Sequence, residues 1–114
     1  MKREVLDYFQ DILDSIEKCE IFLGELSFEE FSRDDKTIYA VIRSLEIIGE
    51  AVKNIPDDVK VKYDNIPWKN IAGMRDKLIH GYFGADIFRV WKTAKEEVPL
   101  LKPIFTKIIS EFEN

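Results

Sequence analysis

Apolar residues recur at every third or fourth position along nearly the whole chain, and the alternation typical of β-strands is absent. In the first segment the repeat runs through Val5, Phe9, Ile12, Ile16 and Cys19. Charged residues fill the other face, and the glycine that follows is a suitable helix stop. This spacing predicts an all-α protein made of amphipathic helices.

A second helix is predicted to begin at Asp34–Asp35, where a carboxylate can cap free backbone N–H groups, and to end at Pro56. Its apolar face consists of Ile38, Val41, Ile42, Leu45, Ile48 and Val52. A separate polar stripe on the same helix consists of Tyr39, Arg43, Glu46, Glu50 and Lys53. Such a stripe is ordinarily a solvated face.

A third helix is predicted from Pro67, which suits a first helical turn, to His80, after which Gly81 and Gly84 interrupt the pattern. Asp86 is the predicted cap of the fourth segment. The apolar stripe of that segment consists of Ile87, Val90 or Trp91, Ala94, Val98, Leu101, Phe105, Ile108 and Phe112.

Two prolines lie off the last stripe, at Pro99 and Pro103. Because the apolar phase continues across them, a kink near Val98 is predicted rather than two unrelated helices. Four helices with short connections predict an antiparallel four-helix bundle that forms one domain over residues 1–114. The connecting segment at 24–34 carries two phenylalanines, which we expect to pack onto the end of the bundle or onto a partner.

Composition excludes several classes of protein. The apolar runs are too short for a membrane span, and the N-terminal segment MKREVLDYFQ lacks the apolar core of a signal peptide. Cys19 has no second cysteine to pair with, so a reducing cytoplasm is expected. The net charge of −5 argues against a general nucleic-acid coat, although a dimer could still concentrate a few cations in one groove.

The stretch GMRDKLIHGYFGAD contains the single histidine of the chain, His80, between Arg75 and Tyr82. The guanidinium of an arginine fits phosphate oxygens, and an imidazole can exchange protons at neutral pH. A helix C-terminus favours the protonated imidazole, and a tyrosine ring could stack on a base. These groups could cleave RNA without a metal, because the ribose 2′-hydroxyl supplies the nucleophile.

Geometry argues against simple convergence of these residues, and the single histidine favours a dimer. Five residues on a straight helix place Arg75 and His80 about 140° apart around the axis. They therefore converge within one chain only if the helix loosens or ends near His80. Acid–base cleavage also needs two proton-transfer groups, and a two-fold axis beside this helix would supply both from one histidine per chain.

Interpretations without catalysis are equally open at this stage. His80 could simply cap a helix end, and Arg75 could pair with Asp76, Glu46 or Glu50. Tyr82 could pack after a turn, and the two tryptophans, at positions 68 and 91, could be core or interface anchors. One histidine and one cysteine cannot form a zinc cluster, and GYFGAD lacks the Lys-Ser/Thr of a phosphate-binding loop.

Several stretches together resemble the HepT-like toxin family of the HEPN superfamily. RDKLIHGY resembles its Arg-x4-His-x-Tyr motif, and AVIRSLEIIGEAVKNI resembles its second-helix signature. IPWKNIAGMRDKLIHGYFGAD and VWKTAKEEVPLLKPI resemble its third and last helices, so that the resemblance covers most of the chain and is weakest at residues 24–34.

The resemblance implies a dimeric, metal-independent ribonuclease that needs no cofactor. Arg75 and His80 would line a cleft at the dimer interface, and Asp76 would occupy a slot that is often polar in the superfamily. The partner would be a minimal nucleotidyltransferase antitoxin that attaches AMP to Tyr82. Adding phosphate beside the catalytic pair would repel RNA. Glu46 or Glu50 would then orient Arg75.

Three further hypotheses follow from the same residues. Arg43 is a candidate cleft residue. The polar stripe would then support RNA binding, and the alternative is that it is simply a solvated face. The chain could instead be a non-catalytic helical partner or a nucleotide-binding subunit of a nucleotidyltransferase. A plain dimeric scaffold would tolerate replacement of Arg75, His80 and Tyr82 alike.

Overall fold

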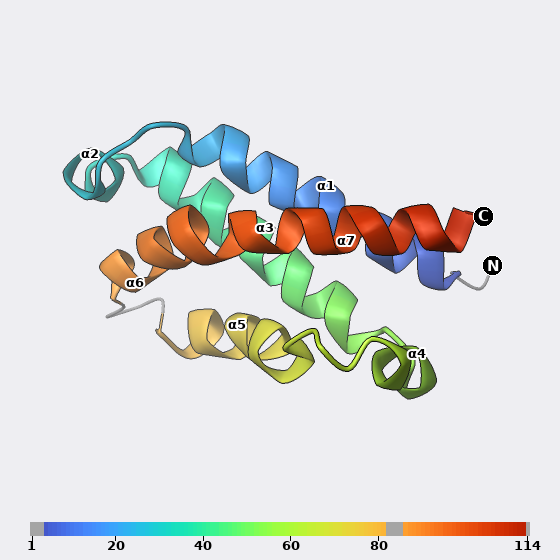
Figure 1. Cartoon of the computed structure of the whole chain (residues 1–114). Coiled ribbons are helices and arrows are strands. Elements are labelled where there is room, and N and C mark those ends of the chain that lie inside the picture. Colours follow the sequence, from blue (N-terminus) through green and yellow to red (C-terminus); the bar gives the residue numbers. More distant parts are fainter. Residues whose placement is uncertain (1–3, 82–85, 114) are drawn as a thin grey trace.

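A computed structural model describes residues 4–81 and 86–113, and of residues 75–81 it describes the path of the backbone. The long helices are α1 (Val5–Leu23), α3 (Asp35–Lys53), α5 (Trp68–Gly81) and α7 (Val98–Glu113). Figure 1 shows the successive long segments running back and forth, so that both chain ends lie at one end of the molecule. The predicted all-α class is confirmed, and no strand occurs among these residues.

The connections contain more helix than the four predicted segments. A short helix, α2 (Phe28–Ser32), lies in the segment that carries the two phenylalanines, and α4 (Asp57–Lys62) follows the second long helix. Helix α3 ends at Lys53 rather than at Pro56, because Asn54 already binds the last turn through its backbone and side chain. Pro56 instead precedes α4 as its N-cap.

Side-chain caps fix where the helices begin. Asp34 accepts a hydrogen bond from the backbone N–H of Thr37, and Asp86 accepts one from Arg89, as the sequence predicts. Ser27 and Glu30 form a reciprocal capping box that allows the five-residue helix α2 to form. Each cap satisfies donors that have no partner within the helix.

The last segment is irregular just before Val98. Helix α6 (Ile87–Lys92) passes into a π-helical turn at Thr93–Glu97, where the Val98 N–H bonds to the Thr93 carbonyl, and then into α7. A proline ring inside a helix clashes with the carbonyl group four residues earlier, which for Pro99 is that of Lys95. The wider π-helical turn contains Lys95 and so makes room for the ring. The chain therefore bends without losing its apolar face, and Figure 1 shows the bend between α6 and α7.

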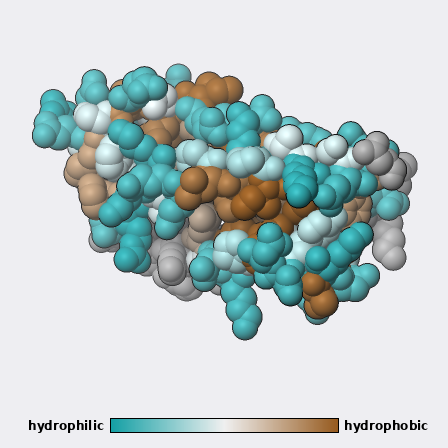
Figure 2. Space-filling view, viewed as in Figure 1, coloured by the Kyte–Doolittle hydropathy of each residue, from teal (hydrophilic) through white to brown (hydrophobic). Residues whose placement is uncertain are grey.

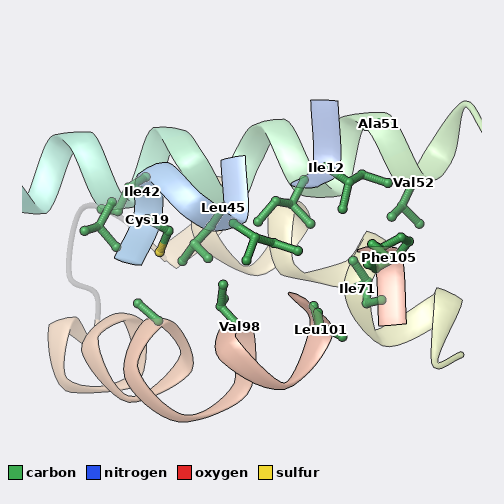
Figure 3. Close-up of a cluster of buried hydrophobic side chains, with 14 of the residues drawn as sticks. Ile12, Cys19, Ile42, Leu45, Ala51, Val52, Ile71, Val98, Leu101 and Phe105 are labelled. Carbon is green, nitrogen blue, oxygen red and sulfur yellow. The ribbon is translucent and has the colours of Figure 1, made fainter. Parts of the chain in front are cut away.

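One hydrophobic core joins the long helices (Figure 3). Helix α1 packs against α3 and α7, and α3 packs against α5. The predicted faces are buried: Phe9, Ile12, Ile16 and Cys19 of α1 are all fully inaccessible to solvent. None of the described helices has the length and apolar character that crossing a membrane requires.

Candidate active site

Trp68 fixes the start of the helix that carries the candidate catalytic residues. Its indole N–H donates to the carbonyl oxygens of Tyr63 at 3.0 Å and of Lys60 at 3.2 Å. Its ring meets Phe105 of α7 edge to face, with the centroids 6.0 Å apart. The prediction that Trp68 is a packing anchor is therefore confirmed, and α5 is tied to both α4 and α7.

Helix α5 continues without a break through His80 and ends at Gly81. Arg75 and His80 consequently occupy positions about 140° apart on one helix. The side chains of Arg75, Asp76 and His80, and the whole of Tyr82, lie outside the described residues. Their convergence in a cleft stays a prediction, while the backbone at Arg75, Asp76 and His80 belongs to the last two turns of α5.

Three residues of the polar stripe on α3 form a charge cluster. The Arg43 guanidinium lies 3.5 Å from a carboxylate oxygen of Glu50 and 3.7 Å from one of Glu46. Glu46 or Glu50 was expected to orient Arg75, and the structure gives each of these glutamates Arg43 as a partner. The Arg43 side chain is 58% exposed, which leaves its guanidinium accessible to a ligand.

The rest of the stripe is mixed in its exposure. Tyr39 and Lys53 are exposed, whereas Glu46 and Glu50 are half-buried. The charge cluster is on α3, and α3 packs against α5, the helix that carries the candidate catalytic residues. A largely surface ion pair of this kind contributes roughly 0–1 kcal/mol to the stability of the fold. Its contribution to folding is therefore too small to explain the cluster by stability alone.

A groove of about 380 Å³ lies elsewhere, between α7 and the segment after α4, and none of the candidate residues lines it. At this groove the Tyr63 hydroxyl donates to a carboxylate oxygen of Glu111 at 3.0 Å. Burial and this hydrogen bond raise the pKa of Tyr63. Figure 2, in the same view as Figure 1, shows hydrophobic side chains gathered in the middle of the visible face, among hydrophilic ones.

Among the residues whose side chains the structure describes, no group of three or more His, Cys, Asp or Glu side chains is placed to hold a metal ion. Cys19 is the buried thiol of the core, and burial raises its pKa to about 12. A neutral, inaccessible thiol is neither a nucleophile nor a ready metal ligand.

Comparison with known proteins settles the family. A family model described as "Ribonuclease HepT-like" matches residues 12–108. The chain belongs to the HepT-like ribonuclease family. Its relatives include a protein of Thermococcus cleftensis named "Probable ribonuclease HepT", which is 56% identical over 95% of this chain and 98% of the relative.

Other relatives of the HepT-like family carry related names. "Putative RNase MJ0125" of Methanocaldococcus jannaschii is 50% identical over 99% of this chain and 97% of that protein. "Putative RNase TTE0752" of Caldanaerobacter subterraneus subsp. tengcongensis is 44% identical over 91% of this chain and 93% of that protein. No solved structure matches the chain. The resemblance seen in the sequence is thus confirmed at the level of the family.

The structure also contains an aromatic cluster that the sequence did not predict. Phe28 of α2 meets Phe88 and Trp91 of α6 at centroid distances of 5.1 Å and 5.9 Å. The sequence signal was the pair of phenylalanines in the 24–34 segment, and Phe31 of that pair is fully buried. The expectation that this segment packs onto the bundle is therefore confirmed.

Proposed function

We propose that this HepT-like protein is a metal-independent endoribonuclease toxin of a toxin–antitoxin pair. The observation that carries the proposal is its relation, over nearly the full chain, to proteins named as ribonucleases. The motif residues Arg75 and His80 lie on a single helix, α5, which packs against α3, the helix that carries the charge cluster. Their chemistry matches what cleavage of RNA requires.

The proposed reaction uses the substrate's own 2′-hydroxyl. One His80 imidazole removes the proton from this hydroxyl, and the oxygen then attacks the adjacent phosphorus. The bond from phosphorus to the 5′-oxygen breaks, and a second, protonated imidazole gives its proton to that leaving oxygen. The products are a 2′,3′-cyclic phosphate and a 5′-hydroxyl end, while Arg75 neutralises the charge that develops on the phosphate.

The second imidazole would come from a second copy of the chain. Each chain has one histidine, and the positions of Arg75 and His80 on continuous helix α5 point in different directions around the axis. In a two-fold dimer, the arginine of one copy can face the histidine of the other across the axis. A strictly monomeric protein in sedimentation experiments that still cleaves RNA would contradict this arrangement.

Cleavage in the presence of a chelator tests the nuclease. Purified protein is incubated with total RNA and EDTA, and the ends of the products are analysed for cyclic phosphate. Activity should persist in EDTA and fall at least about 100-fold in His80→Gln and in Arg75→Gln, since each removes a group that acts in the transition state. Lys69→Gln, an exposed change in the first turn of α5, is the matched control and should retain activity.

Regulation by AMP transfer to Tyr82 completes the proposed function. A nucleotide added there would place negative charge beside Arg75 and His80 and keep RNA out. A minimal nucleotidyltransferase, the partner that this proposal assigns to the protein, is mixed with it and with ATP labelled in the α-phosphate. Label should enter wild type and Tyr39→Phe, whose altered tyrosine is exposed on α3, and should be absent from Tyr82→Phe.

A different outcome would favour the alternative of a non-catalytic partner. If wild type leaves RNA intact under all conditions while it still binds the nucleotidyltransferase, the nuclease proposal is wrong. Binding that survives His80→Gln would then point to a nucleotide-binding or docking role for the bundle.

A further inference from the structure

A partly exposed aromatic cluster with cations over two of its rings lies where α2 meets α6. It consists of Phe28 of α2 and Phe88 and Trp91 of α6, and we call it the ring cluster. Phe28 and Phe88 are nearly perpendicular, at 89°, and Phe88 and Trp91 are tilted by 30° with centroids 5.9 Å apart. Phe88 is 46% exposed, although phenylalanine is an apolar residue that is usually buried.

Two lysines extend over these rings. The ammonium of Lys95 lies 4.7 Å from the centroid of the Trp91 ring, and that of Lys92 lies 6.0 Å from the Phe88 ring. Both lysines are exposed. The carboxylate of Glu29 on α2 is paired with Arg33 at 3.6 Å, which reduces the repulsion that it would offer to a polyanion. The carboxylates of Glu30, Glu96 and Glu97 are also exposed on these segments.

The ring cluster is held firmly in place from below. The Trp91 indole N–H donates to the Leu26 carbonyl oxygen at 3.1 Å, which links α6 to the segment before α2 across 65 residues of sequence. Phe31 of α2 is fully buried beneath the same segment. The cluster is therefore a rigid platform, which lowers the entropy cost of binding a flat ligand.

The platform lies close to the proposed catalytic helix. Asp86, the cap of α6, lies five positions after Gly81, the last residue of α5, so these two positions are at most about 18 Å apart. That distance corresponds to roughly five stacked nucleotides at about 3.4 Å each. Figure 1 shows α2, α6 and the final turn of α5 at the same end of the molecule.

We infer that the ring cluster and its lysines bind bases and phosphates of single-stranded RNA beside the cleavage site. This inference rests on the proposed nuclease function for its choice of ligand. The attraction between a lysine and an exposed ring favours their contact only roughly 2- to 5-fold. A base stacked on an aromatic side chain raises the affinity for RNA roughly 5- to 150-fold. A base can therefore displace the ammonium group from the ring, and the displaced ammonium is then free to bind the phosphate.

The test measures binding separately from cleavage. The probe is a fluorescent 20-nucleotide RNA of mixed sequence in which every ribose is 2′-O-methylated, so that the proposed reaction cannot occur. Phe88→Leu should weaken its binding at least about 5-fold, and Phe88→Trp should restore it, since both variants fill space but only one stacks. Phe112→Leu makes the same change at a partly exposed phenylalanine of α7 and should bind as wild type does.

The lysines are tested by the dependence of affinity on salt. The double variant Lys92→Gln/Lys95→Gln should lower the slope of log affinity against log salt by about 0.7 for each phosphate that a lysine no longer neutralises. The control is Lys62→Gln/Lys107→Gln, which also removes a lysine held over a ring, that of Tyr63 at 5.6 Å. Thermal unfolding is followed in every variant to show that the fold is intact.

The outcomes separate this inference from the nuclease proposal. RNA cleavage by wild type together with unchanged probe binding by Phe88→Leu overturns the inference and leaves the nuclease standing. Probe binding that depends on Phe88 without any cleavage supports the inference and removes the nuclease. A Phe88→Leu protein that loses dimerisation or nucleotidyltransferase binding, but keeps RNA affinity, also overturns it, because the cluster is then a protein interface.

Discussion

The indole N–H of Trp68 lies 3.0 Å from the carbonyl oxygen of Tyr63, so the first residue of α5 is bound to the end of α4. Removing this donor leaves the Tyr63 carbonyl oxygen with only the Ile66 N–H, at 3.1 Å. Trp68→Phe should therefore lower the free energy of unfolding by about 1 kcal/mol, the net value of one hydrogen bond, measured by urea denaturation. Trp68→Leu should cost more, because it also removes the ring that packs on Phe105. Equal stability of Trp68→Phe and wild type would contradict the structural role.

Asp34 gives the stability of α3 a dependence on pH. The Thr37 hydroxyl donates to one carboxylate oxygen at 2.7 Å and the Thr37 backbone N–H donates to the other at 3.1 Å. These two bonds, the first being the larger effect, lower the pKa of Asp34. Its contribution to stability is thus complete above the ordinary aspartate value of about 3.9 and is lost as the pH falls through the lower folded-state value.

The comparison of Asp34→Asn with wild type isolates this effect. The amide keeps an oxygen that can cap the helix but does not titrate. The difference in unfolding free energy between wild type and Asp34→Asn should therefore shrink between about pH 5 and pH 2. A difference that stays constant over that range would show that the carboxylate charge does not matter.

Cys19 should be chemically silent in the folded protein. Its side chain is fully inaccessible, and burial, followed by the neighbouring Glu20, raises the pKa of the thiol to about 12. Labelling with a disulfide reagent at pH 8 should be slow in buffer and should become rapid in denaturing urea. The same shift predicts that stability declines as the pH rises above about 8.5, where the unfolded thiol ionises. Rapid labelling without urea would contradict the packing of α1.

Arg43 tests whether the charge cluster of α3 contributes to RNA binding. Its ion pairs with Glu46 and Glu50, at 3.7 Å and 3.5 Å, are partly exposed, so Arg43→Gln should change stability by about 1 kcal/mol or less. If Arg43 contacts a phosphate, the slope of log RNA affinity against log salt should fall by about 0.7. Lys107→Gln, an exposed change on α7, should leave that slope unchanged. An unaltered slope in Arg43→Gln would assign the cluster to the solvated face.

The sequence alone determined which face of each helix is buried and where several helices begin. Apolar spacing identified Phe9, Ile12 and Ile16 as core residues because a helix brings every third or fourth side chain to one side. Asp34 and Asp86 were recognisable as caps because capping depends on residues three positions apart. The Arg-x4-His-x-Tyr motif and its flanking blocks were enough to predict the family.

Contacts between distant segments were decided only by the tertiary structure. Trp91 and Leu26 are 65 residues apart, and no local spacing predicts that an indole N–H of one reaches the carbonyl of the other. The same holds for the ring cluster, which needs α2 and α6 to meet at one end of the bundle. The partner of Glu50 also depended on geometry, because rotamers and packing decide which cation a carboxylate meets. Local periodicity sets the helices, but the way they pack sets the surface that a ligand meets.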